Sequence, residues 1–351
     1  MATRFCNLYG APEANEFDRE FYSEKIGEKN ILEKNEITND YLNNPITFEE
    51  VEKLIKNLKQ NKSCGFDGIP NEVIKDKHVV LYLWKLFKIL FDTGFMPTIW
   101  LKAVITPIPK GATVDPCIPL NYRGISLLSC VAKTYSGILN NRLIKYLEQT
   151  NFFADEQNGF RKNRSCNDHI FTLNSLIKMS LQAKKSVYAA FVDLEKAFDR
   201  VNRDMLFYKL LKNNINGKIY KAIKLLYTST LSCVMVNGLF TQWFEIYNGV
   251  RQGDTLSPTL FIFFINDLVL HLKDLNLGID IDEEKICILL YADDFVLLAN
   301  SEQDLQLLLN ATYTWCNKWH LKLNTTKTKI IHFRQKKKSN LHPSSYMEGI
   351  K

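Results

Sequence analysis

Apolar and polar residues follow two periodicities along this chain, one of about 3.6 residues and one of two residues. One helix is predicted to begin at Thr47, which has capping-box spacing to Glu50 and precedes a one-sided apolar stripe. Residues 79–97 are apolar on nearly all sides, which predicts a buried helix that ends at Gly94 and Pro97.

Strands are predicted between these helices by alternating or continuous apolar runs. The segments with this pattern are 100–111, 186–194, 231–238 and 243–250. Pro107 and Pro109 place the end of the first strand at a sheet edge or in a loop. The second strand ends on Asp193, and the last two are joined through Gly238. This order of helices and short hairpins favours an α+β fold over a doubly wound sheet.

A further hairpin carries paired acids. Residues 288–291 and 295–299 are apolar and β-prone, and Ala292, Asp293 and Asp294 form the predicted connection. Aspartate is common in turns, so these residues alone indicate a simple turn.

Asp193 changes this interpretation because it is a second carboxylate site at the end of an apolar strand. Burying acids at two strand ends is costly unless a cation neutralises them. With Asp293 and Asp294, Asp193 would supply the all-oxygen ligands that Mg²⁺ prefers. Two unrelated turns with acidic residues are the alternative.

Composition sets broad limits on the protein class. The chain has 351 residues, of which 46% are hydrophobic, enough for two or three compact units with a substantial core. A net charge of +7 and a pI near 8.8 permit a polyanionic partner without requiring one. Eight cysteines and six histidines show no metal-ligand spacing. The sequence has neither a signal-like apolar core near its start nor a membrane-length apolar run, so we expect an intracellular protein that is not secreted and not membrane-embedded.

Several sequence blocks together resemble one protein family. "FVDLEKAFD", "GVRQGDTLSPTLFIFFINDL" and "YADD" occur in the order of the palm motifs of reverse transcriptases, and the chain resembles the enzymes of non-LTR (LINE-like) retrotransposons. "NKSCGFDGIPNEVIK", "ITPIPKG", "NYRGISLL", "EQNGFRKNRSCNDHIFTL" and "WCNKWHLKLNTTKTKIIHF" are similar to other blocks of that family. The resemblance covers about residues 45 to 333.

The resemblance implies a right-hand polymerase with fingers and palm over residues 45–335, the palm being an antiparallel sheet like that of RNA-recognition domains. Residues 1–44 are highly charged with weak periodicity, which predicts a loosely attached helical or irregular segment. Residues 336–351 form a basic tail, and the sequence stops before a recognisable primer grip or thumb. We therefore expect the thumb to be absent or truncated.

The resemblance also implies roles for particular residues. Asp193, Asp293 and Asp294 would bind two Mg²⁺ ions, with Mn²⁺ as an alternative ion, and the carbonyl of Leu194 would be an additional ligand. Tyr291 would lie beside the primer end, and a core tyrosine is the alternative.

The incoming nucleotide is expected near three other residues. Phe198 lies where the family places an aromatic ring under the sugar, and a core phenylalanine is the alternative. Gln252 and Gly253 would contact the nucleotide and the template base, or would form only a structural junction before the helix that Ser257 and Pro258 begin.

Basic residues complete the expected site. Lys110 and Arg123 match the cations that hold the triphosphate. Lys327 matches a lysine that assists the leaving pyrophosphate, and Lys329 is close enough to be an alternative. The cations expected to follow the template backbone are Arg161, Lys162 and Arg164.

The function implied is RNA-directed DNA polymerisation, in which dNTPs are added to the 3′-hydroxyl of a DNA primer on an RNA template, in the nucleus or the cytoplasm. One alternative is a truncated element remnant that binds nucleic acid but cannot polymerise. Another is a two-metal nuclease, which would not need Phe198 or Gln252.

Overall fold

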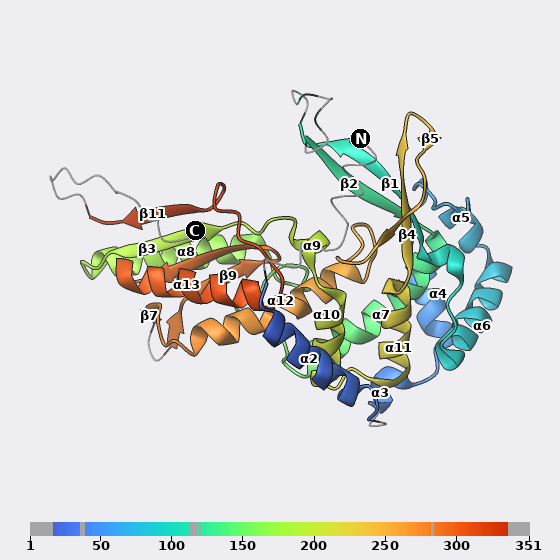
Figure 1. The fold of residues 1–351 in the computed structure, drawn as a ribbon, viewed down its shortest axis with the longest axis horizontal. Coiled ribbons are helices and arrows are strands. Elements are labelled where there is room, and N and C mark those ends of the chain that lie inside the picture. Colours follow the sequence, from blue (N-terminus) through green and yellow to red (C-terminus); the bar gives the residue numbers. More distant parts are fainter. Residues whose placement is uncertain are drawn as a thin grey trace. The chain divides into compact units, whose positions relative to one another are not determined.

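The structure is a computed structural model that describes residues 17–335 apart from 36–38, 112–114, 116–117, 119–120 and 282–283. Figure 1 shows its ribbon. The chain forms two compact units, the first from residues 1–150 and 198–260 and the second from residues 151–197 and 261–351. The predicted basic tail, 336–351, lies outside the described residues, as do residues 1–16.

Helices make up most of the first unit. They are α2 (Arg19–Leu32), α3 (Asp40–Asn43), α4 (Phe48–Lys56), α5 (Asn71–Ile74), α6 (Lys77–Thr93), the 3₁₀ helix η1 (Thr98–Leu101), α7 (Cys130–Gln149), α10 (Arg203–Lys212) and α11 (Gly217–Tyr227). The short helix α9 (Ala197–Arg200) begins on the last residue of the second unit's first segment.

Two helix ends in this unit confirm the sequence predictions. Thr47 is the N-cap of α4, and both hydrogen bonds of the capping box with Glu50 are present. Gly94, with φ of 67°, ends α6 in the left-handed conformation that glycine adopts without steric cost.

The prediction that α6 is buried on nearly all sides is wrong. One face is buried, including Leu83 and Phe87, whereas Tyr82 is 69% exposed and Ile89 is 58% exposed. The rest of the unit packs against only one face of α6, and a helix with apolar residues on both faces gives no sequence signal of which face that is.

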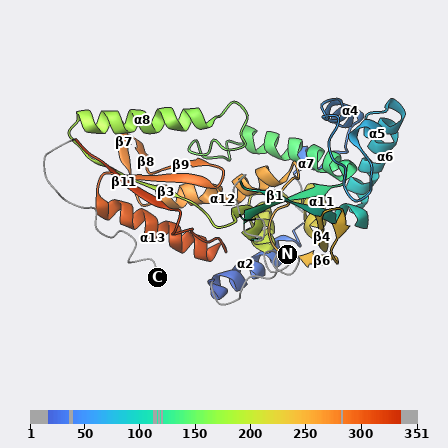
Figure 2. The same cartoon turned by 90° about the horizontal axis from the view of Figure 1, so that it is seen from above.

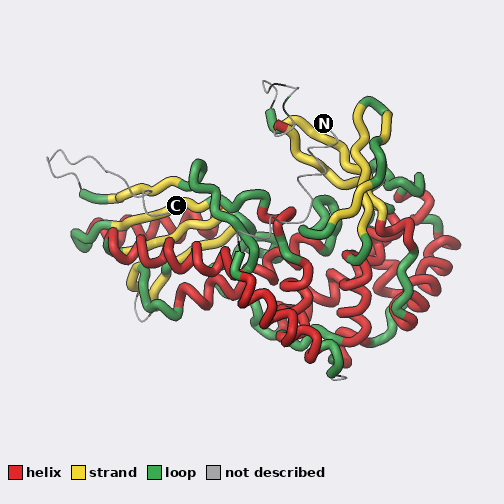
Figure 3. Tube along the Cα trace, in the orientation of Figure 1, coloured by secondary structure: helices red, strands yellow, loops and turns green. Residues whose placement is uncertain are grey.

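The sheet of the first unit is mixed. Its strands are β1 (Lys102–Pro109), β2 (Tyr122–Leu128), β4 (Thr230–Val236), β5 (Leu239–Phe240) and β6 (Phe244–Ile246). Their order is β2-β1-β4-β5, and β6 also pairs with β4. β1 runs antiparallel to β2 and parallel to β4, and Figure 3 shows these strands extending to one side of the unit's helices.

The prolines of β1 lie where the prediction put them. Only Lys102 to Ile105 pair with β4, so within the described part of the chain Pro107 and Pro109 pair with β2 alone. Their missing N–H groups therefore leave no gap in a ladder.

The charged N-terminal segment differs from its prediction because α2 packs closely against α10. Lys29 is buried and its Nζ lies 2.5 Å from the Asp204 carboxylate, and the Tyr208 hydroxyl donates to Glu28 at 2.6 Å. Polar side chains make these contacts, so the weak apolar periodicity of this segment did not reveal its attachment.

The second unit is an antiparallel sheet between helices. Its elements are α8 (Cys166–Gln182), β3 (Val187–Val192), β7 (Ile279–Ile281), β8 (Glu284–Ile286), β9 (Ile288–Tyr291), β10 (Asp294–Ala299), α13 (Glu302–Lys318), β11 (Lys329–Phe333) and most of α12 (Ser257–Lys273). The main sheet has the order β11-β3-β10-β9. Figure 2 shows α8 on one face of this sheet and α13 on the other.

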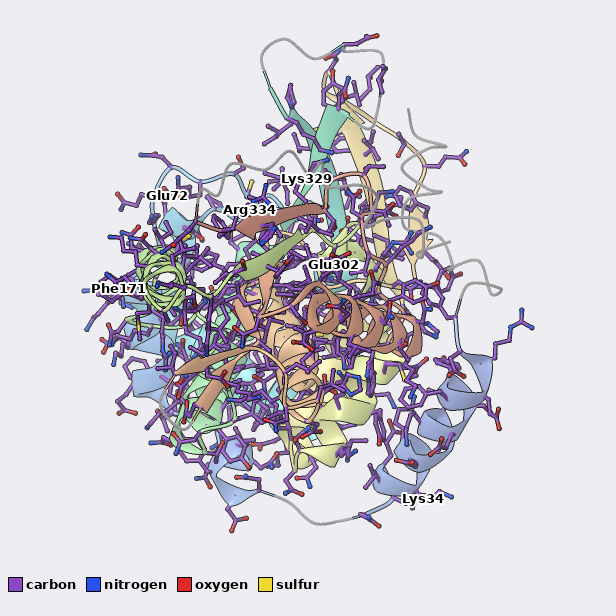
Figure 4. All side chains as sticks on the ribbon, turned by 90° about the vertical axis from the view of Figure 1, so that its left-hand side faces the viewer. Lys34, Glu72, Phe171, Glu302, Lys329 and Arg334 are labelled. Carbon is purple, nitrogen blue, oxygen red and sulfur yellow. The ribbon has the colours of Figure 1, made fainter. Side chains whose placement is uncertain are left out.

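Burial follows this layering. Leu176 of α8 packs with Val187, Ala189, Leu289 and Val296 on one face of the sheet. Phe171, nearer the start of α8, is 73% exposed, and Figure 4 shows it on the outer side of that helix, with Lys329 and Arg334 at the two ends of β11.

The α+β fold predicted from the sequence is confirmed by this arrangement of helices with a mixed and an antiparallel sheet. In α12 the apolar residues are buried on nearly every side of the helix, with Leu270 as an exposed exception. Among the helices of the described residues, none has both the length and the apolarity needed to cross a bilayer.

Candidate active site

The predicted acids lie at one end of the main sheet of the second unit. Asp193 follows directly on β3, and Asp294 begins β10. Phe295 pairs with Val192, so the same antiparallel register continued by one residue sets Asp294 opposite Asp193. Asp293 is in the two-residue turn before β10, and Asp294 already pairs with Tyr291 rather than lying in the connection.

A pocket of about 670 Å³ opens beside these strand ends. Asp193, Asp294, Tyr291 and Lys327 all line it, whereas Asp293 does not. Tyr291 is 39% exposed, so it is not the core tyrosine of the alternative interpretation. The structure thus brings together two of the three predicted acids with the predicted lysine.

Asp193 already has cationic and polar partners. Lys327 Nζ lies 3.4 Å from each oxygen of the carboxylate, and Asn324 Nδ2 donates to its Oδ2 at 2.8 Å. The Asp193 carbonyl accepts from the Asn324 N–H at 2.8 Å. Lys329, the alternative lysine, instead donates to the Thr326 carbonyl at 3.1 Å. The ammonium of Lys327 therefore partly neutralises an acid that a metal ion could also neutralise.

The turn between β9 and β10 has left-handed backbone, since Ala292 has φ of 62°. For a residue with a side chain this conformation costs of order 1–3 kcal/mol and needs support from its surroundings. Gln157 supplies it: its Oε1 accepts from the Ala292 N–H at 3.0 Å and from the Gly159 N–H at 2.7 Å. Gln157 has no exposed surface.

Main-chain contacts reinforce this support. Leu290 N–H donates to the Glu156 carbonyl at 2.8 Å, and Asn158 N–H donates to the Leu290 carbonyl at 3.0 Å. A Cβ on Gly159 would lie 2.2 Å from the Ala292 nitrogen, so only glycine allows this approach. Residues 156–159 therefore fix the backbone of the turn that carries the acids.

In the first unit, the loop Gly249–Asp254 (the glutamine loop) contains the predicted Gln252 and Gly253. Gly253 is exposed and has φ of 117°, and a Cβ there would meet the Ser126 carbonyl oxygen at 2.6 Å. The Ser126 N–H donates to the Gln252 carbonyl at 3.0 Å. Gly253 is thus required by the loop's own backbone, whatever it contacts.

Buried charged residues hold this loop. Arg203 donates to the carbonyls of Gly249, Tyr227 and Ile246 at 2.7–2.9 Å. Arg251 donates to the carbonyls of Trp100 and Leu101 at 2.9 and 3.1 Å. Burial lowers the pKa of both guanidinium groups.

Asp254 completes the anchoring of the loop. Its carboxylate accepts a short hydrogen bond from the Ser136 hydroxyl of α7. Burial raises the pKa of Asp254, while the Ser136 hydroxyl and the charge of Arg251 act in the opposite direction. None of Arg203, Asp254 and Ser136 was singled out from the sequence.

Phe198 and its neighbour are tied to the same loop. The Phe198 carbonyl accepts from the Val250 N–H at 2.8 Å, and the Asp199 Oδ1 accepts from Gln252 Nε2 at 2.9 Å. Phe198 is half-buried. The residues predicted to face the nucleotide are therefore connected through adjacent backbone.

The predicted cations have differing surroundings. Lys110 is exposed just beyond β1, and Arg123 has its main chain on β2 and its side chain outside what the structure describes. Arg161 donates to the carbonyls of Ala154 and Gln157, and Arg164 pairs with the Asp155 carboxylate at 2.6 Å. Lys162 is exposed.

A groove of about 800 Å³ in the first unit is lined by cations that were not predicted as site residues. We call it the lysine groove, after Lys53, Lys62, Lys133 and Lys145 of its lining. Glu50 is the one acid among the described residues that line it, and it is paired with Arg142 at 2.6 Å. The four lysines therefore leave the groove with net positive charge.

Comparison with known proteins identifies the family of this chain. Residues 108–345 match the family model described as reverse transcriptase (RNA-dependent DNA polymerase). The chain belongs to the reverse transcriptase family. It is 31% identical over 318 residues to a probable RNA-directed DNA polymerase from transposon BS of Drosophila melanogaster, covering 87% of this chain and 34% of that protein.

Other similar proteins also come from mobile elements. The chain is 29% identical over 296 residues to the RNA-directed DNA polymerase from mobile element jockey of Drosophila melanogaster, covering 82% of this chain and 32% of that protein. It is 30% identical over 222 residues to a Pol polyprotein from a type-1 retrotransposable element R2 of Nasonia vitripennis, covering 63% of this chain and 21% of that protein. The chain thus spans about a third of the length of the first two relatives.

Reverse transcriptases generally use divalent metal ions. Within the described residues, no group of three or more His, Cys, Asp or Glu side chains is close enough together to hold a metal ion. The donor set is nonetheless suitable, since carboxylate oxygens at adjacent strand ends are hard ligands and Asp193 is contacted by a cation.

The residues that support the site were not predicted from the sequence of this member of the reverse transcriptase family. Gln157 and Gly159 stand in "EQNGFRKNRS", a block in which only the cations were given a role. Asp199 is the last residue of "FVDLEKAFD", and Arg203 lies four residues beyond that block. Gln157, Gly159 and Asp199 lie within blocks that resemble the family, which was the available signal, whereas Arg203 lies in none of them.

Proposed function

We propose that this chain is the polymerase part of a non-LTR retrotransposon protein and adds dNTPs to a DNA primer on an RNA template. The observation that carries the proposal is the pair of carboxylates at adjacent ends of β3 and β10, beside a supported turn, in a member of the reverse transcriptase family. The relatives' names state the same activity for those proteins.

Asp193, Asp293 and Asp294 would hold two Mg²⁺ ions, and the carbonyl of Leu194 would be a further ligand. Bound divalent ions lower the pKa of a hydroxyl nucleophile and stabilise charge on a transferring phosphoryl group. Lys327 contacts the Asp193 carboxylate. When metal ions neutralise that carboxylate instead, the Lys327 ammonium would be free to donate a proton to the leaving pyrophosphate. Tyr291 lines the same pocket and would lie beside the primer end.

In the first unit, the proposal assigns nucleotide contacts to Phe198, Gln252 and Gly253. The supporting observation is that hydrogen bonds of the buried Arg203 and Arg251 and of Asp199 hold the glutamine loop, and a selective contact surface needs such fixed geometry. Lys110 and Arg123 would hold the triphosphate.

Template contacts are proposed for cations of both units. Arg161, Lys162 and Arg164 belong to the second unit, and the lysine groove to the first. Phosphate contacts by lysine and arginine give affinity that is independent of sequence and weakens as salt rises. The lysine groove supports nucleic-acid binding because its positive charge is not offset by the acid in its lining.

Primer extension tests the proposed function. The purified chain is incubated with an RNA template, a labelled DNA primer, dNTPs and Mg²⁺, with a chelator in a parallel reaction. We expect template-dependent lengthening of the primer that the chelator abolishes. Shortened nucleic acid would indicate the two-metal nuclease, and binding without extension would indicate a remnant that cannot polymerise.

A further inference from the structure

Asn324 joins the Asp193 carboxylate to the turn that carries Lys327. Its Nδ2 donates to Asp193 Oδ2 at 2.8 Å. At the other end of the same amide, Oδ1 accepts from the Thr326 hydroxyl at 2.7 Å and from the Lys327 N–H at 3.3 Å. An ionised carboxylate only accepts hydrogen bonds and a main-chain N–H only donates, so both contacts require the same orientation of the amide.

Main-chain contacts also hold Asn324 beside the acid. Its N–H donates to the Asp193 carbonyl at 2.8 Å, and its own carbonyl accepts from the Thr328 N–H at 2.9 Å and from the Thr328 hydroxyl at 2.8 Å. Directly before it, Leu323 forms an isolated β-bridge with Leu194. The position of the Asn324 side chain is therefore set by the backbone on both sides of the residue.

We propose that Asn324 is a positioning residue for metal binding, because it holds the Asp193 carboxylate in one orientation before a divalent ion arrives. The inference rests on the proposed function, which makes Asp193 a metal ligand. An ionised carboxylate has about four acceptor positions, so one hydrogen bond to Asn324 leaves others for the ion. Hydrogen-bond partners of metal ligands contribute about tenfold to a hundredfold to metal affinity.

Asn324 and Lys327 contact the same carboxylate with different consequences. Lys327 Nζ lies 3.4 Å from both oxygens of Asp193, and the lysine side chain is 68% exposed. Its positive charge would oppose a metal ion at that carboxylate, and its long side chain can move away. The Asn324 amide is uncharged and half-buried, so it can keep its contact when an ion binds. Asn324 therefore orients the acid without competing with the ion for its charge.

Asn324→Ser separates the two ends of the amide. A serine hydroxyl can still accept from a main-chain N–H of the turn, but it is too short to replace the donor to Asp193. Thr326→Ala is a milder change at an exposed residue, because it removes one donor to Oδ1 and leaves the contact with Asp193 in place. Asn300→Ser is the matched control, since Asn300 follows the far end of β10 and donates to the Gly278 carbonyl at 2.9 Å.

The measurement is the binding of Mn²⁺ alone, followed by electron paramagnetic resonance of the free ion, beside the Mg²⁺ dependence of primer extension. We expect Asn324→Ser to weaken the Mn²⁺ binding that Asp193→Asn removes by about tenfold or more. Thr326→Ala should weaken it by about twofold, and Asn300→Ser should leave it unchanged. In primer extension, Asn324→Ser should need more Mg²⁺ for its half-maximal rate and regain most of the rate at high Mg²⁺, which a general loss of structure would not allow.

Equal Mn²⁺ affinity of the parent chain and a folded Asn324→Ser protein would overturn the proposal. So would equal affinity of the parent chain and Asp193→Asn, because Asp193 would then not be the ligand that Asn324 holds. Should circular dichroism show that Asn324→Ser does not fold, an unchanged Mn²⁺ affinity in Thr326→Ala would overturn it instead. If the parent chain does not extend a primer, the proposed function fails, while the ratio of Mn²⁺ affinities still decides the role of Asn324.

Discussion

The turn that carries the acids and the glutamine loop both contain left-handed backbone, yet they are supported by different chemistry. Ala292 in the turn is held by a neutral amide, that of Gln157, and by main-chain hydrogen bonds from residues 156–159. The glutamine loop is held by buried charged side chains, among them Arg203 and Arg251. Each region lies in a different compact unit.

The difference follows from what each region must present. A guanidinium group under the turn would neutralise the carboxylates that are to bind a cation, whereas a neutral amide supports the backbone and leaves their charge available. The glutamine loop presents an amide and a glycine, so buried charge beneath it does not compete with its contacts. The group that contacts the Ala292 N–H is therefore a neutral amide, whereas charged groups contact the glutamine loop directly.

Gly159→Ala should have the largest effect among changes to these supports. The new Cβ would lie 2.2 Å from the Ala292 nitrogen, a backbone atom, so the turn must move. We expect primer extension to fall about a hundredfold or more, because small displacements of reacting groups cost this much. Gly27→Ala on α2, where nothing lies within 4 Å, is the control. Near-parental extension by Gly159→Ala would show that the close approach is unimportant.

Arg203→Met should lower stability more than any change at Gln157. Arg203 is 7% exposed, and its guanidinium group donates hydrogen bonds to several carbonyls, which would all lose this donor. We expect a loss of about 3–5 kcal/mol in the free energy of unfolding, measured by urea denaturation. The exposed Lys221→Met is the matched control. If Arg203→Met lost less free energy of unfolding than Gln157→Leu, the buried charge under the glutamine loop would not be the stronger of the two supports.

Substitutions of Gln157 test whether the side chain that holds the turn must be uncharged. Gln157→Leu removes the acceptor for two N–H groups and should cost about 1–3 kcal/mol of stability. Gln157→Glu keeps an acceptor but buries a carboxylate near the acids, so it should be less stable than the leucine variant. Thermal melting of both variants gives the order. A glutamate variant as stable as the parent would mean that neutrality is not required.

The smallest effect is expected in the lysine groove. Lys133→Gln and Lys145→Gln should each reduce the slope of log affinity for single-stranded RNA against log salt by about 0.7, if each lysine contacts one phosphate. Fluorescence anisotropy across a salt series measures this slope. Lys77→Gln, an exposed lysine that does not line the groove, is the control. Equal slopes for all three variants would remove the groove from the template path.

Local signals in the sequence predicted much of the fold. The capping box at Thr47 and Glu50, the left-handed end of α6 at Gly94, and the strand that leads into Asp193 all depend on neighbouring residues. The supports could not be predicted in this way. Gln157 and Ala292 are 135 positions apart, and Arg203 and Gly249 are 46 apart, so only the folded chain brings them together.

The side-chain contacts of α2 show the same limit. Its attachment to α10 depends on Lys29, Glu28 and Tyr208, which look like solvated residues until their partners are known. Candidate acids were found because family motifs mark them. Gln157 and Gly159 also lie in a family block, but nothing in the sequence of that block indicates that they contact the turn.

The central claim is that the carboxylates at the ends of β3 and β10 perform nucleotide addition. The most direct test is primer extension by Asp193→Asn beside the parent chain, with Asp280→Asn of β7 as a control acid in the same unit and circular dichroism to verify the fold. We predict that Asp193→Asn loses extension by about a thousandfold or more, while Asp280→Asn keeps the parental rate. Extension by a folded Asp193→Asn protein at the parental rate would contradict the account.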